Sequence, residues 1–375
     1  MFFKEIIGQR NIKKKLIENA GKGRLAHAQL FHGKAGFGGL PLAIAYAQYI
    51  SCENKQESDS CGTCKSCVKY QKLIHPDLHF IFPVNTTGNV TKDPASDDFM
   101  NEWREFVLKN PYFTSDQWYE FIGIENKQGL INKTESQNLI QKLSYKSFEA
   151  EYKTVIIWLP EKMNDTASNK LLKLIEEPEG KTLFFLISEN PDQIIPTILS
   201  RVQQVKIPEI EEKDLSEGLR KKFTLTDEEL SGIARLAGGD YTYALEIIDT
   251  SEQTEYNLQK FIDWMRLCYK KSIPELVDWV DEIHTIGRER QKSFLSYSLK
   301  MLRENFILNN KLKNIVYMNK DENDFSKNFH PFINHSNVNE MYRELNKAYN
   351  DIEYNAYSKV VFLDTSLHLV KLIKN

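Results

Sequence analysis

Residues 31–45 read "FHGKAGFGGLPLAIA": a short apolar stretch, a glycine-rich loop and the start of an alanine-rich helix. Such a loop between a strand and a helix is typical of phosphate-binding loops, whose backbone N–H groups hold phosphate at the helix N-terminus. A working loop, GxxxxGK[ST], would place a lysine at 39 and a hydroxyl residue at 40, where this chain has Gly39 and Leu40. The sequence therefore predicts the fold of a nucleotide site without two side chains that hold the nucleotide. The glycines of this degenerate loop are Gly33, Gly36, Gly38 and Gly39.

Strands and helices alternate on either side of this loop. The segments "AQLFHG", "KTVIIWL" and "KTLFFLIS" are nearly continuous apolar runs, and "TASNKLLKLIEE" has helical periodicity. Buried strands that alternate with helices predict an α/β domain with a parallel sheet covered on both faces, over residues 1–208. Residues 84–130 carry polar turn residues and then an aromatic-rich amphipathic stretch, which we interpret as an insertion without assigned chemistry.

The rest of the chain is predicted to be helical. The segments "EEKDLSEGLRKKF", "TDEELSGIARLAGG" and "DYTYALEIIDT" predict three short helices, which form a small domain over residues 209–250. Longer amphipathic patterns follow over residues 251–375 and predict a larger all-helical domain.

Composition bounds the function classes. The chain has 375 residues, 41% hydrophobic and 27% charged, as in an ordinary globular protein. Its formal net charge of -3 provides no general attraction to a phosphate backbone. We see neither a secretory signal nor a run long enough to span a bilayer, so we expect a cytoplasmic protein without a membrane partner.

Four of the five cysteines form a compact cluster, Cx8CxxCxxC, over residues 52–67. Soft ligands at this spacing predict one structural Zn²⁺ with no open position. A redox role is the alternative, but it requires a CxxC motif that opens a helix in a thioredoxin-like context. We interpret Cys268 as a small buried apolar residue, and His75 and His79 as packing residues rather than rival ligands. The predicted zinc ligands are Cys52, Cys61, Cys64 and Cys67.

A second part of the predicted nucleotide site also lacks the side chains that a working site needs. Phosphate-loop ATPases place an aspartate for magnesium, and usually a glutamate, at the end of the strand that corresponds to "TVIIWL". This chain has Trp158 and Leu159 there, and Glu161 is the first carboxylate that follows. Lys34 lies at the front of the loop, not at the helix start, and we interpret it as a solvated lysine.

Several motifs together resemble one family. "RLAHAQLFHGKAGFGG", the cysteine cluster, "HPDLHFIFP", "MNDTASNKLLKLIEEP" and "IIPTILSR" occur in the order found in AAA+ clamp-loader subunits of bacterial DNA polymerase III. Within that family the chain looks most like the delta-prime type, over roughly residues 1–250. The resemblance implies a P-loop-type AAA+ domain with a zinc module, a helical lid domain and a C-terminal helical collar domain for oligomerisation.

The resemblance also implies roles for particular residues. In these assemblies an arginine of a Ser-Arg-Cys motif reaches the ATP held by the neighbouring subunit, and this chain has Ser200, Arg201 and Val202 at those positions. A further arginine, which touches nucleotide in the family's ATPases, corresponds to Tyr243. The implied reading is that Arg201 serves a neighbour as a trans arginine finger, while the chain binds no ATP in its own site.

The expected function is therefore that of a non-catalytic clamp-loader subunit within the DNA polymerase III holoenzyme. Its implied partners are ATPase subunits of the gamma/tau type and a delta-like clamp-opening subunit, which together place a sliding clamp on primed DNA. Two alternatives stay open: an active AAA+ ATPase that uses Lys34 and Glu161, and a binding adaptor unrelated to replication that only retains the fold.

Overall fold

The structure is a computed structural model that describes the whole chain except residues 125–126, 179, 313–315, 317 and 374–375. The chain forms two compact units, Met1–Ile247 and Ile248–Asn375, which are described separately below. The finer division into three domains at residues 208 and 250 remains a prediction.

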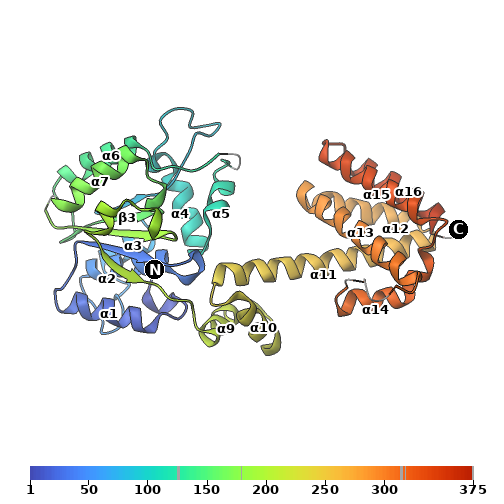
Figure 1. Cartoon of the computed structure of the whole chain (residues 1–375), viewed down its shortest axis with the longest axis horizontal. Coiled ribbons are helices and arrows are strands. Elements are labelled where there is room, and N and C mark those ends of the chain that lie inside the picture. Colours follow the sequence, from blue (N-terminus) through green and yellow to red (C-terminus); the bar gives the residue numbers. More distant parts are fainter. Residues whose placement is uncertain (125–126, 179, 313–315, 317, 374–375) are drawn as a thin grey trace. The chain divides into compact units, whose positions relative to one another are not determined.

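The first unit is built on a β-sheet, in which Figure 1 labels β3. Its five strands lie in the order β2-β3-β4-β1-β5. Every strand pairs in parallel with its neighbours. This confirms the predicted α/β domain with a parallel sheet. The strands are β1 (Ala28–His32), β2 (Leu78–Ile81), β3 (Lys153–Trp158), β4 (Thr182–Ser188) and β5 (Gln203–Lys206).

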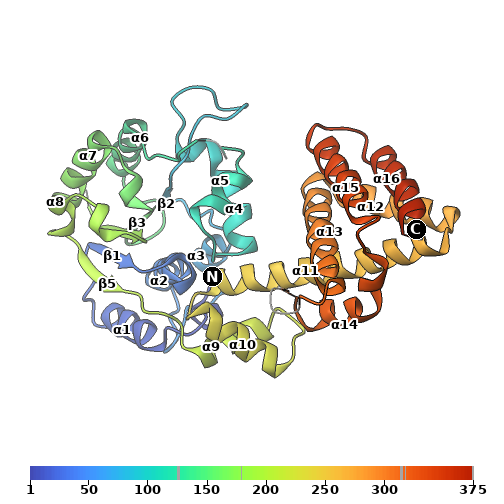
Figure 2. The ribbon, with the colours of Figure 1, turned by 45° about the vertical axis from the view of Figure 1, so that its right-hand side comes forward.

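Helices cover both faces of the sheet (Figure 2). Successive side chains of a strand point to opposite faces, so Phe185 belongs to one apolar cluster and Phe184 to the other. The first cluster packs under α1 (Arg10–Gly21), α2 (Gly39–Ser51), α3 (Lys65–Gln71), α4 (Met100–Lys109) and α5 (Ser115–Phe121). The second packs under α6 (Lys133–Ser144), α7 (Asp165–Glu176) and α8 (Pro196–Leu199).

Short 3-10 helices join these elements. They are η1 (Phe3–Glu5), η2 (Ala35–Phe37), η3 (Ser96–Phe99), η4 (Pro160–Lys162) and η5 (Pro191–Gln193).

The predicted insertion is part of the core. Residues 84–130 contain η3, α4 and α5, whose aromatic side chains join the first apolar cluster. Trp103 of α4 stacks on Phe82 with ring centroids 4.1 Å apart, and it also contacts Trp158 at 5.4 Å. The insertion therefore covers the carboxyl end of β3.

Three helices follow the sheet: α9 (Glu212–Arg220), α10 (Asp227–Ala237) and α11 (Tyr241–Lys270). The prediction of a third short helix was wrong, because α11 continues for 30 residues and passes from the first unit into the second. Its sequence contains neither glycine nor proline, so nothing in the local chemistry ends the helix near residue 251.

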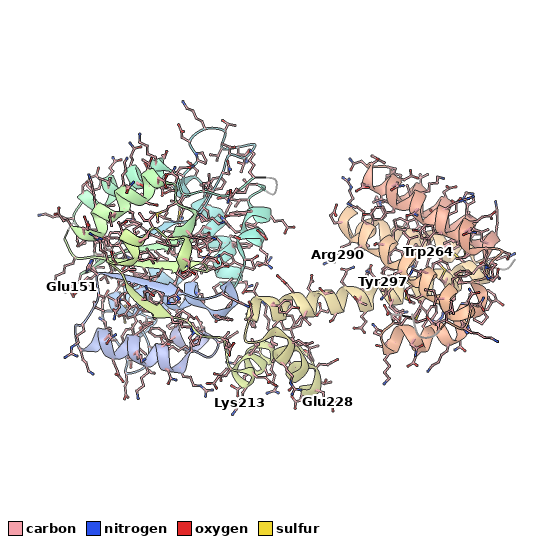
Figure 3. The ribbon with its side chains drawn as sticks, viewed as in Figure 1. Glu151, Lys213, Glu228, Trp264, Arg290 and Tyr297 are labelled. Atoms are coloured by element: carbon pink, nitrogen blue, oxygen red, sulfur yellow. The ribbon has the colours of Figure 1, made fainter. Side chains whose placement is uncertain are left out.

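The second unit is a helical bundle with its own core. Trp264 of α11, labelled in Figure 3, is fully buried. Its ring stacks on that of Trp279 with centroids 4.9 Å apart. The helices that complete it are α12 (Ile273–Thr285), α13 (Arg288–Asn309), α14 (Lys320–Phe329), η7 (His330–Phe332), α15 (Val338–Glu353) and α16 (Ser358–Leu372). In the described part of the chain, no helix combines the length and apolar character needed to cross a membrane.

Candidate nucleotide cleft and zinc centre

Two backbone N–H groups of the glycine loop donate hydrogen bonds to carbonyl groups of the same loop. Between β1 and α2 the chain turns through η2, where the N–H of Phe37 donates to the carbonyl of Lys34 at 3.0 Å. The N–H of Gly38 donates to the carbonyl of Ala35 at 3.4 Å. A phosphate-binding loop needs such N–H groups free to point at the ligand. These two donors are already satisfied within the turn.

A carboxylate lies directly against the same loop. A Cβ on Gly36 would lie 1.8 Å from Oδ1 of Asp240, so the carboxylate fills the space in front of this glycine. The same Oδ1 accepts a hydrogen bond from the N–H of Tyr243 at 3.1 Å, in the first turn of α11. Asp240 therefore caps α11 and places negative charge where a phosphate would need positive charge.

Tyr112 covers the next glycine. Gly38 has φ +90°, and a Cβ on it would lie 3.1 Å from Cε1 of the Tyr112 ring. The Tyr112 hydroxyl accepts a hydrogen bond from the N–H of Ile7 at 2.9 Å. Its ring packs edge-on against Tyr241 at 4.9 Å, and burial raises the pKa of its hydroxyl. Leu40, at the position of the absent hydroxyl, is buried.

Apolar side chains occupy the magnesium positions at the end of β3. Trp158 and Leu159 are each only 3% exposed. The Trp158 ring lies 5.0 Å from that of Phe113, which follows α4. A hydrated metal ion requires oxygen ligands and open space, and this strand end offers neither.

Two partly buried glutamates lie beyond the ends of β3 and β4. Oε1 of Glu161 accepts hydrogen bonds from the N–H groups of Glu189 and Asn190, at 2.9 and 3.1 Å. Burial raises the pKa of Glu161. Burial and the negative charges of Glu161 and Asp240 raise the pKa of Glu189 to about 7, while Lys162 lowers it. The structure therefore brings two carboxyl groups together beyond the ends of β3 and β4, and burial favours their protonated, uncharged forms.

Lys34, which the alternative ATPase would use, and Tyr243, at the position of a family arginine, are both exposed. Lys34 is exposed, and its Nζ lies 6.0 Å from the ring of Phe37. Tyr243, at the position of the family's second arginine, is 49% exposed. Its side chain carries no positive charge for a phosphate.

Arg201 lies in the turn after α8, and neighbouring groups bind its guanidinium through Nε and Nη1. Its Nε pairs with Oε1 of Glu176 at 2.5 Å. Its Nη1 donates to the carbonyl of Thr197 at 2.9 Å and to the hydroxyl of Ser200 at 3.0 Å. The side chain remains 40% exposed. These contacts fix the guanidinium while leaving part of it open to solvent.

The four clustered cysteines converge. Their sulfur atoms all lie within 4.8 Å of one another, and the Cys61 and Cys67 sulfurs are 3.9 Å apart. Tetrahedral Zn²⁺ with bonds of about 2.3 Å separates its sulfur ligands by roughly 3.8 Å, so the donor set fits zinc. The cluster of Cys52, Cys61, Cys64 and Cys67 contains neither His75 nor His79.

Backbone N–H groups in this loop point at the sulfurs. The Cys61 N–H donates to the Cys52 sulfur at 3.3 Å, and the Cys64 N–H donates to the Cys61 sulfur at 3.4 Å. The Cys64 and Thr63 N–H groups lower the pKa of the Cys61 thiol to about 6. Such bonds favour the thiolate, which is the form that binds metal.

Sequence reasoning missed two residues that lie against the glycine loop, Asp240 and Tyr112. "GGD" before a helix signals a helix cap, but it does not show that the cap also touches the glycine loop. Tyr112 belongs to the insertion, to which no role was assigned. Both contacts are tertiary, and no local pattern encodes them.

Comparison with known proteins identifies relatives of this chain. A family profile described as "DNA polymerase III, delta subunit" matches residues 8–211. DNA polymerase III subunit delta′ of Bacillus subtilis is 26% identical over 249 residues, which are 66% of this chain and 60% of the relative. DNA polymerase III subunit delta′ of Escherichia coli is 24% identical over 233 residues, 62% of this chain and 58% of the relative. The chain thus spans about three fifths of the length of these relatives.

Among solved structures, a gamma-subunit-related protein of Thermotoga maritima aligns with 97% of this chain and 99% of its own. Its sequence identity is 15% and its TM-score is 0.34.

Zinc binding can be tested by removing one ligand. Because each sulfur completes the tetrahedron, we expect Cys64→Ser to lower the zinc content from one ion per chain towards zero and to lower the thermal midpoint. Elemental analysis of the purified, dialysed protein measures the content. Cys268→Ala is the matched control and should retain one zinc, since Cys268 lies outside the cluster. Full zinc content in Cys64→Ser would contradict the assignment.

The raised pKa of Glu189 predicts a pH-dependent stability. The folded chain holds a proton on Glu189 up to about pH 7, whereas the unfolded chain releases it near the ordinary value of 4.5, so Glu189 destabilises the fold as pH rises through this window. We expect Glu189→Gln to be more stable than wild type at pH 8 by about 1–3 kcal/mol, with little difference at pH 4.

Thermal midpoints at a series of pH values measure this difference. The exposed Glu105 provides the control, because Glu105→Gln should follow the wild-type curve. A constant offset of Glu189→Gln from wild type across the pH range would show that the carboxyl group is not the cause.

Proposed function

Since this chain belongs to the DNA polymerase III delta-subunit family, we propose that it acts as a clamp-loader subunit of the delta-prime type. In this role it braces the assembly, binds no ATP itself and completes the ATP site of a neighbouring subunit. Its partners are ATPase subunits of the gamma/tau type and a delta-like clamp-opening subunit. The assembly places a sliding clamp on primed DNA during replication.

The observation that carries the proposal is the carboxylate of Asp240 against Gly36. A bound triphosphate would have to displace Asp240 from its cap on α11 and face its negative charge. Neither Gly39 nor Leu40 supplies the compensating cation or magnesium ligand. An empty nucleotide site in this chain is the state that these contacts favour.

Tyr112 and Trp158 support the same conclusion by steric means. Tyr112 packs on Gly38, and Trp158 fills the strand end where magnesium would bind. Opening the cleft would expose both rings, and burying an aromatic side chain contributes about 1.5–3 kcal/mol. Nucleotide binding would therefore have to offset the loss of native packing.

Arg201 supports the role in trans. A guanidinium that reaches a neighbour's γ-phosphate stabilises the charge of the transferring group and needs no nucleotide in its own subunit. Glu176 bonds Nε and Thr197 bonds Nη1, so the guanidinium is pre-ordered with one side open. Pre-ordering lowers the entropy cost of reaching the phosphate.

The test uses the assembled complex. We expect Arg201→Ala to lower hydrolysis at the site it completes by at least about tenfold without preventing assembly, because the transition-state charge loses its partner. Glu176→Gln should lower the rate less, since it only loosens the positioning of Arg201. Arg220→Ala, an exposed arginine on α9, is the control and should hydrolyse ATP at the wild-type rate.

Steady-state ATPase assays with partner subunits, and size-exclusion chromatography of each mixture, measure these outcomes. Calorimetry of the isolated chain with MgATP should give no heat of binding. Binding there would instead favour an active ATPase that uses Lys34 and Glu161. Failure to assemble with clamp-loader ATPase subunits would favour an adaptor outside replication.

A further inference from the structure

Residues 52–67, which carry the four clustered cysteines and are called the zinc loop below, contact another segment of this chain, residues 2–7. Asp59 lies in the loop between Cys52 and Cys61, and its two carboxylate oxygens accept hydrogen bonds from consecutive backbone groups. The N–H of Phe3 donates to Oδ1 at 3.2 Å, and the N–H of Lys4 donates to Oδ2 at 3.1 Å. Hydrogen bonds to a charged acceptor are among the stronger ones in proteins. They join the zinc loop to η1.

A second contact comes from the CxxC turn of the same zinc loop. Gly62 has φ +78°, and a Cβ on it would lie 2.7 Å from the ring of Phe2. The Gly62 carbonyl accepts a hydrogen bond from Nε2 of Gln71 at 2.9 Å, which fixes the turn on α3. Phe3 is 2% exposed and packs against Tyr49 of α2. Residues of the zinc loop therefore hold both the backbone and an aromatic ring of segment 2–7.

The end of this segment reaches the glycine loop through one side chain. The Ile6 carbonyl accepts a hydrogen bond from Nζ of Lys13 at 2.6 Å, which fixes the segment on α1. The Ile7 N–H donates to the Tyr112 hydroxyl at 2.9 Å. The Tyr112 ring in turn packs on Gly38. Contacts thus run without interruption from the zinc loop to the closed face of the glycine loop.

We propose that the zinc loop is an intramolecular docking site for residues 2–7, and that this docked segment positions Tyr112 over the glycine loop. Zinc then supports the Tyr112 ring against Gly38 through the docked segment. The loop between Cys52 and Cys61 is mostly exposed, so without metal it would have to be ordered at a cost in conformational entropy. Zinc fixes both ends of the loop and thereby places Asp59 and Gly62 for docking.

The inference goes beyond the trans role of Arg201 and does not depend on it. It rests on zinc occupying the four cysteines, which the measurement of zinc content tests separately.

Hydrogen exchange of the full chain, resolved to single amides by mass spectrometry, tests the docking. We expect Asp59→Ala to retain one zinc and to speed exchange roughly tenfold at the amides of Phe3, Lys4 and Ile7, since each loses an acceptor or its support. Exchange at Phe37 and Gly38 should rise as well, because Tyr112 is no longer held. Glu57→Ala, an exposed acid in the same loop, should exchange like wild type.

A second pair of variants isolates the last contact. Tyr112→Phe removes only the hydroxyl and should speed exchange at Ile7 while leaving Phe3 and Lys4 unchanged. Tyr119→Phe is its matched control, because within the described residues the buried Tyr119 hydroxyl has no hydrogen-bond partner. It should leave exchange at Ile7 at the wild-type rate.

Removal of zinc from wild type with a chelator should reproduce the Asp59→Ala pattern. The proposal is overturned if Asp59→Ala speeds exchange only at Phe3 and Lys4, or if chelation leaves residues 3–7 protected. If the chelated protein unfolds, the zinc-loaded Asp59→Ala chain decides the question. If that variant fails to fold, Asp59→Asn, which keeps one acceptor oxygen, must give a smaller increase at the same amides.

Discussion

The parallel sheet of the first unit must be buried on both faces, and this constraint organises everything around it. Side chains of β1, β3 and β4 alternate between two apolar clusters, so each strand is apolar along its length. Only the carboxyl ends of the strands remain available for polar chemistry. The glycine loop follows β1, Trp158 is the last residue of β3 and Glu189 follows β4, so all three lie at that edge of the sheet. The side chains at that edge therefore decide which ligands this unit can bind.

In this chain carboxyl groups and aromatic rings lie at that edge of the sheet. The carboxylate of Asp240 lies against Gly36 of the glycine loop. Glu161 and Glu189 lie beyond the ends of β3 and β4, and burial together with the charges of Glu161 and Asp240 raises the pKa of Glu189 to about 7. A phosphate held at Gly36 would face the negative charge of Asp240. The apolar side of the edge is equally closed, because Trp158 joins an aromatic group built by the insertion. Charge at Gly36 and packing at Trp158 thus support, for separate reasons, the proposal that this chain binds no triphosphate.

The sequence predicted what local chemistry encodes. Three strands with continuous apolar runs, the glycine loop and the cysteine cluster carry their signals in adjacent residues, and the sheet and the convergence of the sulfurs agree with them. The strands β2 and β5 were missed because each has only four residues and β5 is an exposed, polar edge strand. The contacts of Tyr112 and Asp240 with the glycine loop join distant segments, so periodicity and propensity carry no information about them.

Asp240 links the glycine loop to the stability of a long helix. The residue that blocks Gly36 also caps α11, a helix of 30 residues that extends into the second unit. The substitutions Gly39→Lys and Leu40→Thr would leave the Asp240 carboxylate against Gly36. Removing that carboxylate would cost the helix its cap, about 1 kcal/mol. The carboxylate that lies against the glycine loop is thus tied to the stability of α11.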